Sequence, residues 1–311
     1  MRLLHVFLIT FVLPFTASCQ NNESPLAAPK GMLAIRDLNY AGTTHWRQTL
    51  DLFVPEKPSE KPLPLVVFIH GGGWENGSKN SGGALLPLME SGNYVGASIN
   101  YRLTNEGPHP MQIHDCKAAI RWLRAHAKDY GIDSDKIGVF GISAGGHLVS
   151  LLGTGGDVKE LEGTVGKHLN QSSRVTCVVN FCGPANFLTF AGKGSVIDPE
   201  NAKSGIGKLL GGKLSARQAA AKVASPVTYI SKDDPPFLHI HGTKDNLVPY
   251  DQPKEFDAAL EAAGIPSTLL TGEGEGHVFY NQPLIRNIRA FLDKHLRGRL
   301  GGVREGPIRD R

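Results

Sequence analysis

A serine between glycines, at the junction of a strand and a helix, is the feature that most constrains the fold of this chain. Residues 136–140 form a short strand-like apolar run, and residues 147–152 form an apolar helical run. Ser143 lies at the turn between them, two positions from both Gly141 and Gly145. Such a turn strains the serine backbone and requires small neighbours, a pattern called the nucleophile elbow. The sequence therefore predicts a serine hydroxyl held clear of a sheet, at the positive end of a helix.

A serine nucleophile needs further groups from the rest of the chain. Taken alone, the turn is also compatible with a glycine-serine loop that has no chemistry. Catalysis requires a general base, a carboxylate that orients this base, and backbone donors for the developing negative charge. In folds built on this elbow, the order along the chain is serine, then acid, then histidine. The acid and the histidine are therefore expected after Ser143 in the sequence, in that order.

A glycine-rich loop follows an early apolar strand. Residues 65–69 are continuously apolar, as expected for a strand covered on both faces, and residues 70–74 read His-Gly-Gly-Gly-Trp. Glycines allow a backbone to approach a ligand closely and to present its N–H groups. We predict that the N–H groups of Gly72, Gly73 and Ala144 form the oxyanion hole.

Two late loops carry the predicted acid and base. Asp245 follows a strand expected at residues 237–241, and His277 is the one histidine in the glycine-rich loop after the last expected strand. We predict that His277 takes the proton of Ser143 and that Asp245 orients its imidazole. Other aspartates near this strand either precede it or begin a helix, which makes them weaker candidates: Asp233, Asp234 and Asp251. No cofactor and no metal is predicted for this chemistry.

The other histidines and the cysteines are expected to have structural roles. We expect His70 to brace the glycine-rich loop, and a position beside the pocket suits His147. The remaining histidines considered lie in strand or helix patterns: His114, His126, His239, His241 and His295. The cysteines of the body form no Cys-x-x-Cys motif and are expected to be buried free thiols: Cys116, Cys177 and Cys182.

The alternation of strand and helix patterns predicts a mostly parallel sheet with helices on both faces. Residues 49–54 alternate like an exposed edge strand, whereas residues 111–130 and 281–296 have helical spacing. A segment rich in Gly, Lys and Ala, at about residues 183–235, interrupts this alternation. We predict that it forms a small helical lid and that, together with Trp74, it lines the substrate pocket.

The first residues have the pattern of an export signal. Arg2 precedes an apolar run from Leu3 to Phe15 that is too short to span a bilayer, so residues 1–18 are predicted to be a signal peptide. Cys19 ends a sequence that resembles a bacterial lipobox, except that threonine replaces the usual leucine. The chain is therefore expected to be exported, either freely secreted or attached to a membrane through a lipid on Cys19.

The catalytic domain is predicted to span residues 46–297. Residues 19–45 are expected to form a flexible leader, and residues 298–311 a disordered basic tail. The net charge is +4, and the arginine-rich tail carries most of it. Because the predicted domain is close to neutral, the sequence provides no reason to expect a nucleic-acid partner.

Four motifs in this order resemble the α/β-hydrolase esterases of the acetyl-esterase and hormone-sensitive-lipase-like group. They are residues 70–74, 100–103 (Asn-Tyr-Arg-Leu), 141–146 and 241–245 (His-Gly-Thr-Lys-Asp). Ile142 replaces the acidic residue of many lipase-like members, so the similarity is closer to bifunctional feruloyl and acetylxylan esterases. The resemblance implies an α/β-hydrolase fold and a serine carboxylic-ester hydrolase that acts on small esters or acylated polysaccharide.

Two other functions stay open at this point. One is amide hydrolysis, because arylformamidases and prolyl-oligopeptidase-type peptidases share this catalytic domain. Such peptidases usually carry a propeller domain in front, and the residues before the first expected strand are too few to build one. The other is a non-catalytic binding module on a hydrolase fold, which the complete set of catalytic positions disfavours.

Overall fold

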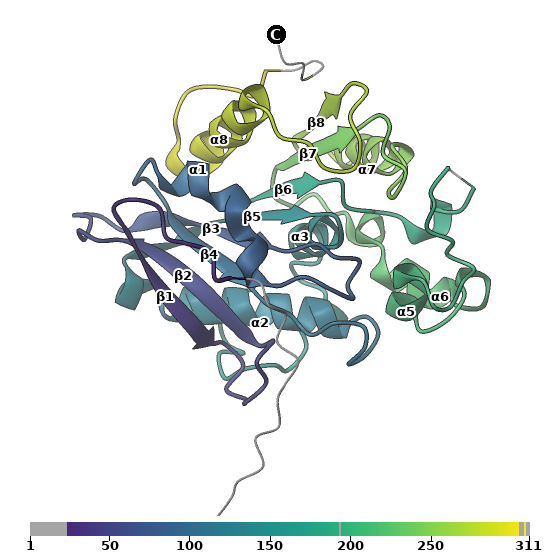
Figure 1. Ribbon diagram of the computed structural model, residues 1–311, viewed down its shortest axis with the longest axis horizontal. Helices are drawn as coiled ribbons and strands as arrows, with labels where there is room; N and C mark the ends of the chain where they lie inside the picture. The colour runs from purple at the N-terminus through teal and green to yellow at the C-terminus, as the bar shows by residue number, and fades with distance from the viewer. Residues whose placement is uncertain (1–23, 193, 305–307, 309–311) are drawn as a thin grey trace, which may run out of the picture.

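The structure, a computed structural model, describes residues 24–192, 194–304 and 308 and is organised around a central twisted sheet (Figure 1). Eight strands of these residues pair in the order β1-β2-β4-β3-β5-β6-β7-β8. β2 pairs antiparallel with both β1 and β4, whereas all other neighbouring strands are parallel. The predicted α/β-hydrolase fold with a mostly parallel sheet is therefore confirmed.

The inner strands are apolar because helices cover both of their faces. Every residue of β4, β6 and β7 is buried, as expected for parallel strands of this kind. The strand bounds are β1 Met32–Asn39, β2 Thr49–Pro55, β3 Leu63–Ile69, β4 Val95–Ile99, β5 Ile132–Ile142, β6 Cys177–Phe181, β7 Phe237–Gly242 and β8 Ser267–Gly272.

Helices pack on both faces of the sheet and produce two apolar cores. Alternate residues of β3 point to opposite faces, so Val67 lies in one core and Phe68 in the other. The core that contains Val67 is completed by α2 (Met111–Ala125), α3 (Ala144–Thr154) and α7 (Asp251–Ala262). The core that contains Phe68 is completed by α1 (Leu86–Met89) and α8 (Gln282–Arg297). No helix within the described residues is long and apolar enough to cross a membrane.

The N-terminal edge of the sheet differs from the prediction. β1 occupies part of the predicted flexible leader (19–45) and pairs with β2, so β2 is not the edge strand expected at 49–54. The alternation in β2 has another cause, because Asp51 is fully buried between the cationic side chains of Arg36 and Lys79. A buried charge needs such partners. The polar residue that indicated solvent exposure is instead part of a buried ion-pair cluster.

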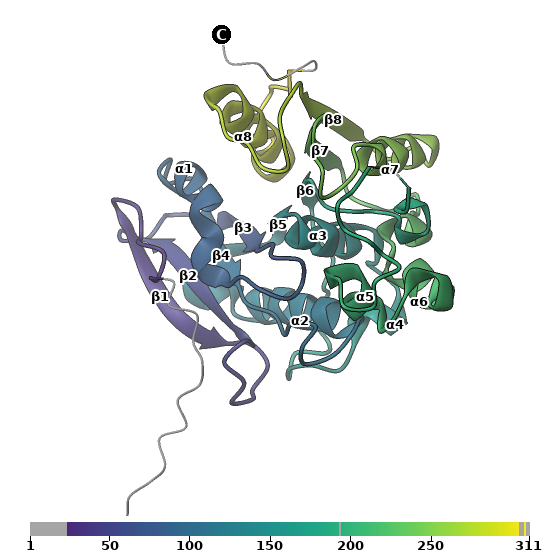
Figure 2. The same cartoon turned by 45° about the vertical axis from the view of Figure 1, so that its right-hand side comes forward.

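The predicted lid segment, residues 183–235, lies between β6 and β7. Apart from residue 193 it is described, and it forms short helices rather than a long loop. These are η3 (Phe187–Thr189), α5 (Gly205–Leu210), η4 (Leu214–Ala216), α6 (Gln218–Ala224) and η5 (Pro226–Tyr229). Figure 2 shows α5 and α6 side by side at the right of the molecule, below α7. Three further short helices lie elsewhere: η1 (Lys79–Leu85), η2 (Ala127–Tyr130) and α4 (Lys159–Glu162).

The two ends of the chain are described only in part. The predicted signal peptide (1–18) and Cys19 lie outside the described residues. At the other end, Ile308 is buried, and its N–H donates to Thr271 O at 2.9 Å. This contact differs from the predicted disordered tail (298–311), since an apolar side chain within the basic segment packs against the core.

Candidate active site

Ser143 lies at the strained turn that the sequence predicts. It follows β5 and precedes α3, with φ 57° and ψ −120°. A non-glycine residue in such a conformation costs about 1 to 3 kcal/mol and persists only where its surroundings hold it. A Cβ atom at Gly145 would lie 2.0 Å from Ile69 O, and one at Gly141 would lie 2.2 Å from Gly145 O. Both glycines are therefore required by the close approach of α3 to β3 and β5.

Asp245 and His277 form a hydrogen-bonded pair from the loops after β7 and β8. His277 Nδ1 lies 2.7 Å from Asp245 Oδ2. The other oxygen, Oδ1, accepts from the N–H groups of Leu247 and Val248 at 2.8 and 3.0 Å. With its proton on Nδ1, the imidazole keeps the Nε2 lone pair free as a base. The pair has the arrangement that an acid-oriented general base requires.

A second histidine contacts the same carboxylate. His241, in β7, has its Nε2 3.0 Å from Asp245 Oδ2 and 2.8 Å from Val248 O. Burial raises the pKa of Asp245, but the hydrogen bonds from His241 and His277 lower it more, so this pKa lies well below its usual range. Asp245 therefore stays ionised. The sequence pattern indicates only that His241 lies in a strand. Its position at the strand end, shortly before Asp245, is the signal that could have revealed this contact.

The glycine-rich loop lies against the elbow. A Cβ atom at Gly71 would be 3.2 Å from Ser143 Cβ, and one at Gly72 would be 2.3 Å from Asn76 O. Gly72 and Gly73 have φ values of 103° and 62°, a region that favours glycine. Their N–H groups donate to no residue within the described part of the chain.

Ala144 supplies a third N–H group at this place. It is the first residue of α3, where backbone N–H groups have no acceptor within the helix. Ala144, Gly72 and Gly73 all line the same cavity as Ser143. The structure thus brings the three predicted donors to one cavity, at the positive end of a helix dipole.

His70 is buried and braces the start of this loop. Its Nδ1 lies 2.8 Å from Gly71 O, and its ring stacks on Tyr101 with centroids 4.3 Å apart. The Tyr101 hydroxyl donates to His70 O at 3.0 Å. Burial lowers the pKa of His70 to about 4, so its imidazole is neutral at physiological pH. This environment suits a structural residue.

Ser143 and His277 line one cavity without a hydrogen bond between them. Ser143 Oγ bonds to no described residue, and His277 Nε2 has Cys182 Sγ as a neighbour at 3.7 Å. Catalytic hydrogen bonds are often long in a free enzyme and shorten when substrate binds. The contact between Cys182 and His277 could not be found from the sequence, because the two residues follow different strands.

The cavity above Ser143 has a volume of about 370 Å³ and mostly apolar walls. The lid segment contributes one wall with Pro184, Phe190, Ile197 and Ile206, and the loops after β7 and β8 contribute Leu247, Val248 and Val278. Among the lining residues, His277 is the one basic side chain. We call this space the catalytic cavity, and its lining suits an uncharged, largely apolar substrate group.

Trp74, the predicted substrate contact, is held rigidly at the edge of this cavity. Its Nε1–H donates to His147 Nδ1 at 3.1 Å, and His147 Nε2 lies 2.7 Å from Ala224 O in the lid segment. Burial lowers the pKa of His147 to about 4, so this imidazole is neutral. Trp74 and His147 therefore connect the glycine-rich loop to the lid.

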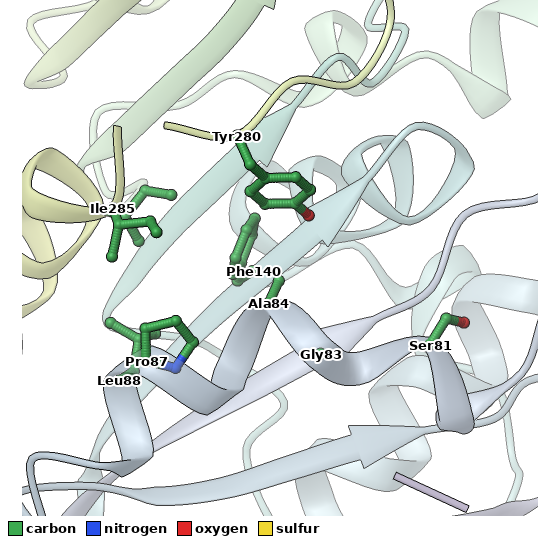
Figure 3. Close-up of a pocket in the computed structure, with 9 residues that line it drawn as sticks. Ser81, Gly83, Ala84, Pro87, Leu88, Phe140, Tyr280 and Ile285 are labelled. Carbon is green, nitrogen blue, oxygen red and sulfur yellow. The ribbon is translucent and has the colours of Figure 1, made fainter. Parts of the chain in front are cut away.

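A second cavity, of about 400 Å³, lies between η1, α1 and α8. Figure 3 shows Tyr280 and Phe140 near its centre, with Ile285 of α8 and Pro87 and Leu88 of α1 to their left. The other lining residues are Ser81, Gly83, Ala84 and Ile288. No histidine or carboxylate lines this α1–α8 cavity, so it has no general base beside its one serine. The catalytic groups therefore converge only on the other cavity among those described.

Sequence comparison places these motifs within a known family. The family model BD-FAE matches residues 50–260. Esterase LipC of Mycobacterium tuberculosis is 29% identical over 269 residues, which cover 83% of this chain and 65% of LipC. The chain spans about half the length of several other curated relatives that it matches.

Solved structures share the fold. A truncated carbohydrate esterase from gut microbiota has a TM-score of 0.79 and 28% identity, over 88% of this chain and 100% of its own. A bifunctional GH43-CE protein of Bacteroides eggerthii has a TM-score of 0.76 and 33% identity, over 85% of this chain and 35% of its own. The described domain is similar to the full length of a truncated esterase and to one part of a larger protein.

Proposed function

Because the chain belongs to the BD-FAE family, we propose that it is a serine carboxylic-ester hydrolase that works through an acyl-enzyme. One observation carries the proposal. The hydrogen-bonded His277–Asp245 pair lines the same cavity as Ser143, whose backbone is strained in the manner of a nucleophile elbow. The esterase names of the relatives support the same chemistry.

The proposed reaction starts at the hydroxyl of Ser143. His277 Nε2 accepts the hydroxyl proton while Oγ attacks the ester carbonyl carbon. The ionised Asp245 stabilises the imidazolium that forms. The oxyanion receives hydrogen bonds from the predicted donors, Gly72, Gly73 and Ala144.

Two steps complete the reaction. The tetrahedral intermediate collapses, and the imidazolium of His277 gives its proton to the departing alcohol oxygen. Water then attacks the acyl group on Ser143 while His277 accepts its proton; the bond to Oγ breaks, the imidazolium returns the proton to Ser143 Oγ, and the acid leaves. All proton transfers use one imidazole, so no further ionisable side chain is needed.

For the substrate, we propose acetyl or feruloyl esters of polysaccharide, or small esters of the same acids. The catalytic cavity supports this choice because its apolar walls suit an alkyl or aromatic acyl group. The similarity to one structural neighbour, a carbohydrate esterase, supports a carbohydrate alcohol.

A substrate panel tests the proposal. We expect the purified protein to release acetate from acetylxylan or ferulate from methyl ferulate, in addition to hydrolysing p-nitrophenyl acetate. The Ser143→Ala variant provides the matched control. Faster hydrolysis of N-formylkynurenine or of prolyl peptides than of every ester would contradict the proposal and favour an amide hydrolase. Hydrolysis of none of these compounds would favour a non-catalytic binding module.

We also propose that the protein is exported, either freely secreted or attached to a membrane through a lipid on Cys19. Support comes from the short apolar run after Arg2 and from the lipobox-like sequence that ends at Cys19. Cell fractionation tests this proposal, with Cys19→Ala as the comparison. Export with attachment that depends on Cys19 indicates a lipoprotein, and export without attachment indicates free secretion. Retention of the full-length chain in the cytoplasm would contradict export.

A further inference from the structure

Cys182 lies beside the proposed general base, although the proposed reaction does not use it. It directly follows β6, is buried, and has a φ of 48°. Its Sγ is 3.7 Å from His277 Nε2. One ligand atom from each of Cys182, Asp245 and His277 lies within 4.8 Å of the others, and no other group of this kind occurs among the described residues.

The sulfur–nitrogen separation fits a shared metal ion. Zinc binds thiolate sulfur at about 2.3 Å and imidazole nitrogen at about 2.05 Å, so a tetrahedral angle separates the two ligand atoms by about 3.6 Å. The observed 3.7 Å between Cys182 Sγ and His277 Nε2 is close to this value. An ion could therefore bridge the two side chains without a large movement of either loop.

Asp245 prepares the histidine for such a ligand. Its Oδ2 atom lies 2.7 Å from His277 Nδ1 and fixes the proton on that nitrogen, which leaves the Nε2 lone pair available. Carboxylates in this position orient metal-binding histidines and increase their basicity. Because Oδ2 of Asp245 already contacts both His277 and His241, Asp245 fits this supporting role better than direct coordination of the metal.

The charges around the thiol also favour a cation. The carboxylate of Asp245 lies in the same group of ligand atoms as the Cys182 thiol. A divalent cation would compensate the negative charges of the carboxylate and of the thiolate that the metal binds. Binding would form a metal–sulfur and a metal–nitrogen bond and release the thiol proton to solvent.

We propose that Cys182 and His277 form an inhibitory site for a soft divalent cation, of which Zn²⁺ is the best example. The ion would reach the site from the catalytic cavity, which His277 lines, and water would fill its remaining coordination positions. Inhibition rests on the proposed function, because the metal and the Ser143 proton compete for the same Nε2 lone pair. Binding of the metal does not depend on that function.

The first experiment measures inhibition of p-nitrophenyl acetate hydrolysis by micromolar ZnCl₂, followed by chelation with EDTA. We expect reversible inhibition of the wild type. For Cys182→Ala, we expect the half-inhibiting Zn²⁺ concentration to rise about tenfold or more, because soft thiolate ligands select zinc. Cys182→Ser should behave in the same way, since it retains the volume of the side chain without the thiolate.

Cys177→Ala is the matched control. Cys177 is another buried free cysteine, at the start of β6, but unlike Cys182 it belongs to no group of three or more metal-ligating side chains among the described residues. This variant should retain the inhibition of the wild type. Equal Zn²⁺ sensitivity of the wild type and both Cys182 variants would overturn the proposal, provided that all variants are folded by circular dichroism.

A second readout is independent of ester hydrolysis. Co²⁺ bound to a thiolate gives a near-ultraviolet charge-transfer band, which we expect in the wild type and in Cys177→Ala but not in Cys182→Ala. If the band follows this pattern while no ester is hydrolysed, the metal site stands and the proposed function fails. If esters are hydrolysed but neither the band nor Zn²⁺ inhibition depends on Cys182, the metal proposal fails and the function stands.

Discussion

The two cavities of this molecule are nearly equal in size but differ in their lining. The catalytic cavity, of about 370 Å³, and the α1–α8 cavity, of about 400 Å³, are both mostly apolar. Only the first combines a strained serine, a histidine with an ionised partner, and glycine backbone at positive φ. Volume and hydrophobicity therefore do not identify the active site; convergent polar groups and stored backbone strain do.

The largest expected effect comes from removing one serine in each cavity. Ser143→Ala should lower kcat for ester hydrolysis by about 10⁴-fold or more, because the acyl-enzyme cannot form. Ser81→Ala, in the α1–α8 cavity, should leave kcat and KM unchanged, since the Ser81 hydroxyl donates only to Ser78 O within the described residues. Steady-state kinetics of both variants measure the contrast. A large loss of activity in Ser81→Ala alone would reverse the assignment of the two cavities.

Asp245→Asn should have the next largest effect. The amide cannot stabilise the imidazolium and favours the wrong tautomer of His277, so we expect kcat to fall about 10³- to 10⁴-fold with little change in KM. Steady-state kinetics at neutral pH test this expectation. Activity near that of the wild type would show that the His277–Asp245 contact has no catalytic role.

The same variant makes a second measurement possible, the dependence of stability on pH. The pKa of Asp245 is lowered in the folded state, so its ionised form contributes stability above its unfolded value of about 3.9. This contribution is lost as the pH falls through the lower, folded-state pKa. Urea unfolding from about pH 5 to about pH 2 should show a smaller loss of stability in Asp245→Asn than in the wild type. Equal losses would contradict the lowered pKa.

A substitution at His241, which contacts Asp245 but does not line the catalytic cavity, should have a smaller effect on kcat. His241→Asn removes one of the two histidine contacts to Asp245, and the loss of one such hydrogen bond should lower kcat about tenfold. KM should not change, because His241 does not line the cavity. A change in KM alone would show that His241 acts through the shape of the cavity.

The smallest expected effect comes from shortening one apolar side chain in the wall of each cavity. Ile197→Ala enlarges the catalytic cavity and should change the ratio of kcat/KM between acetyl and longer acyl esters about tenfold. Ile285→Ala makes the same truncation in the α1–α8 cavity and should leave this ratio unchanged. An equal change of the ratio in both variants would show that the α1–α8 cavity also contacts substrate.

The parts that could be predicted from the sequence are those that depend on order and local pattern. The strand–turn–helix at Ser143 and the loop positions of Asp245 and His277 follow from motifs whose sequence is tied to one fold. The contact between Asp245 and His277 then follows, because the carboxyl ends of parallel strands meet at one edge of the sheet.

The parts that could not be predicted depend on contacts between distant segments. In the sequence, Asp51 looks like a solvent-facing residue, because nothing there shows that Arg36 and Lys79 lie beside it. For the same reason β1 was assigned to the flexible leader, since its pairing with β2 is not visible in the sequence. Likewise, a strand pattern shows that Cys182 and His241 are buried but not which catalytic side chain each one contacts. These contacts with His277 and Asp245 can be identified only once the pairing of the strands is known.

The central claim is that Ser143 is a nucleophile activated by His277. Labelling of the folded protein with a fluorophosphonate, followed by peptide mass spectrometry, tests it most directly. We predict a single adduct on Ser143 in the wild type and loss of this adduct in His277→Ala. The absence of an adduct in the folded wild type, or an adduct on another residue with Ser143 unmodified, would contradict the account.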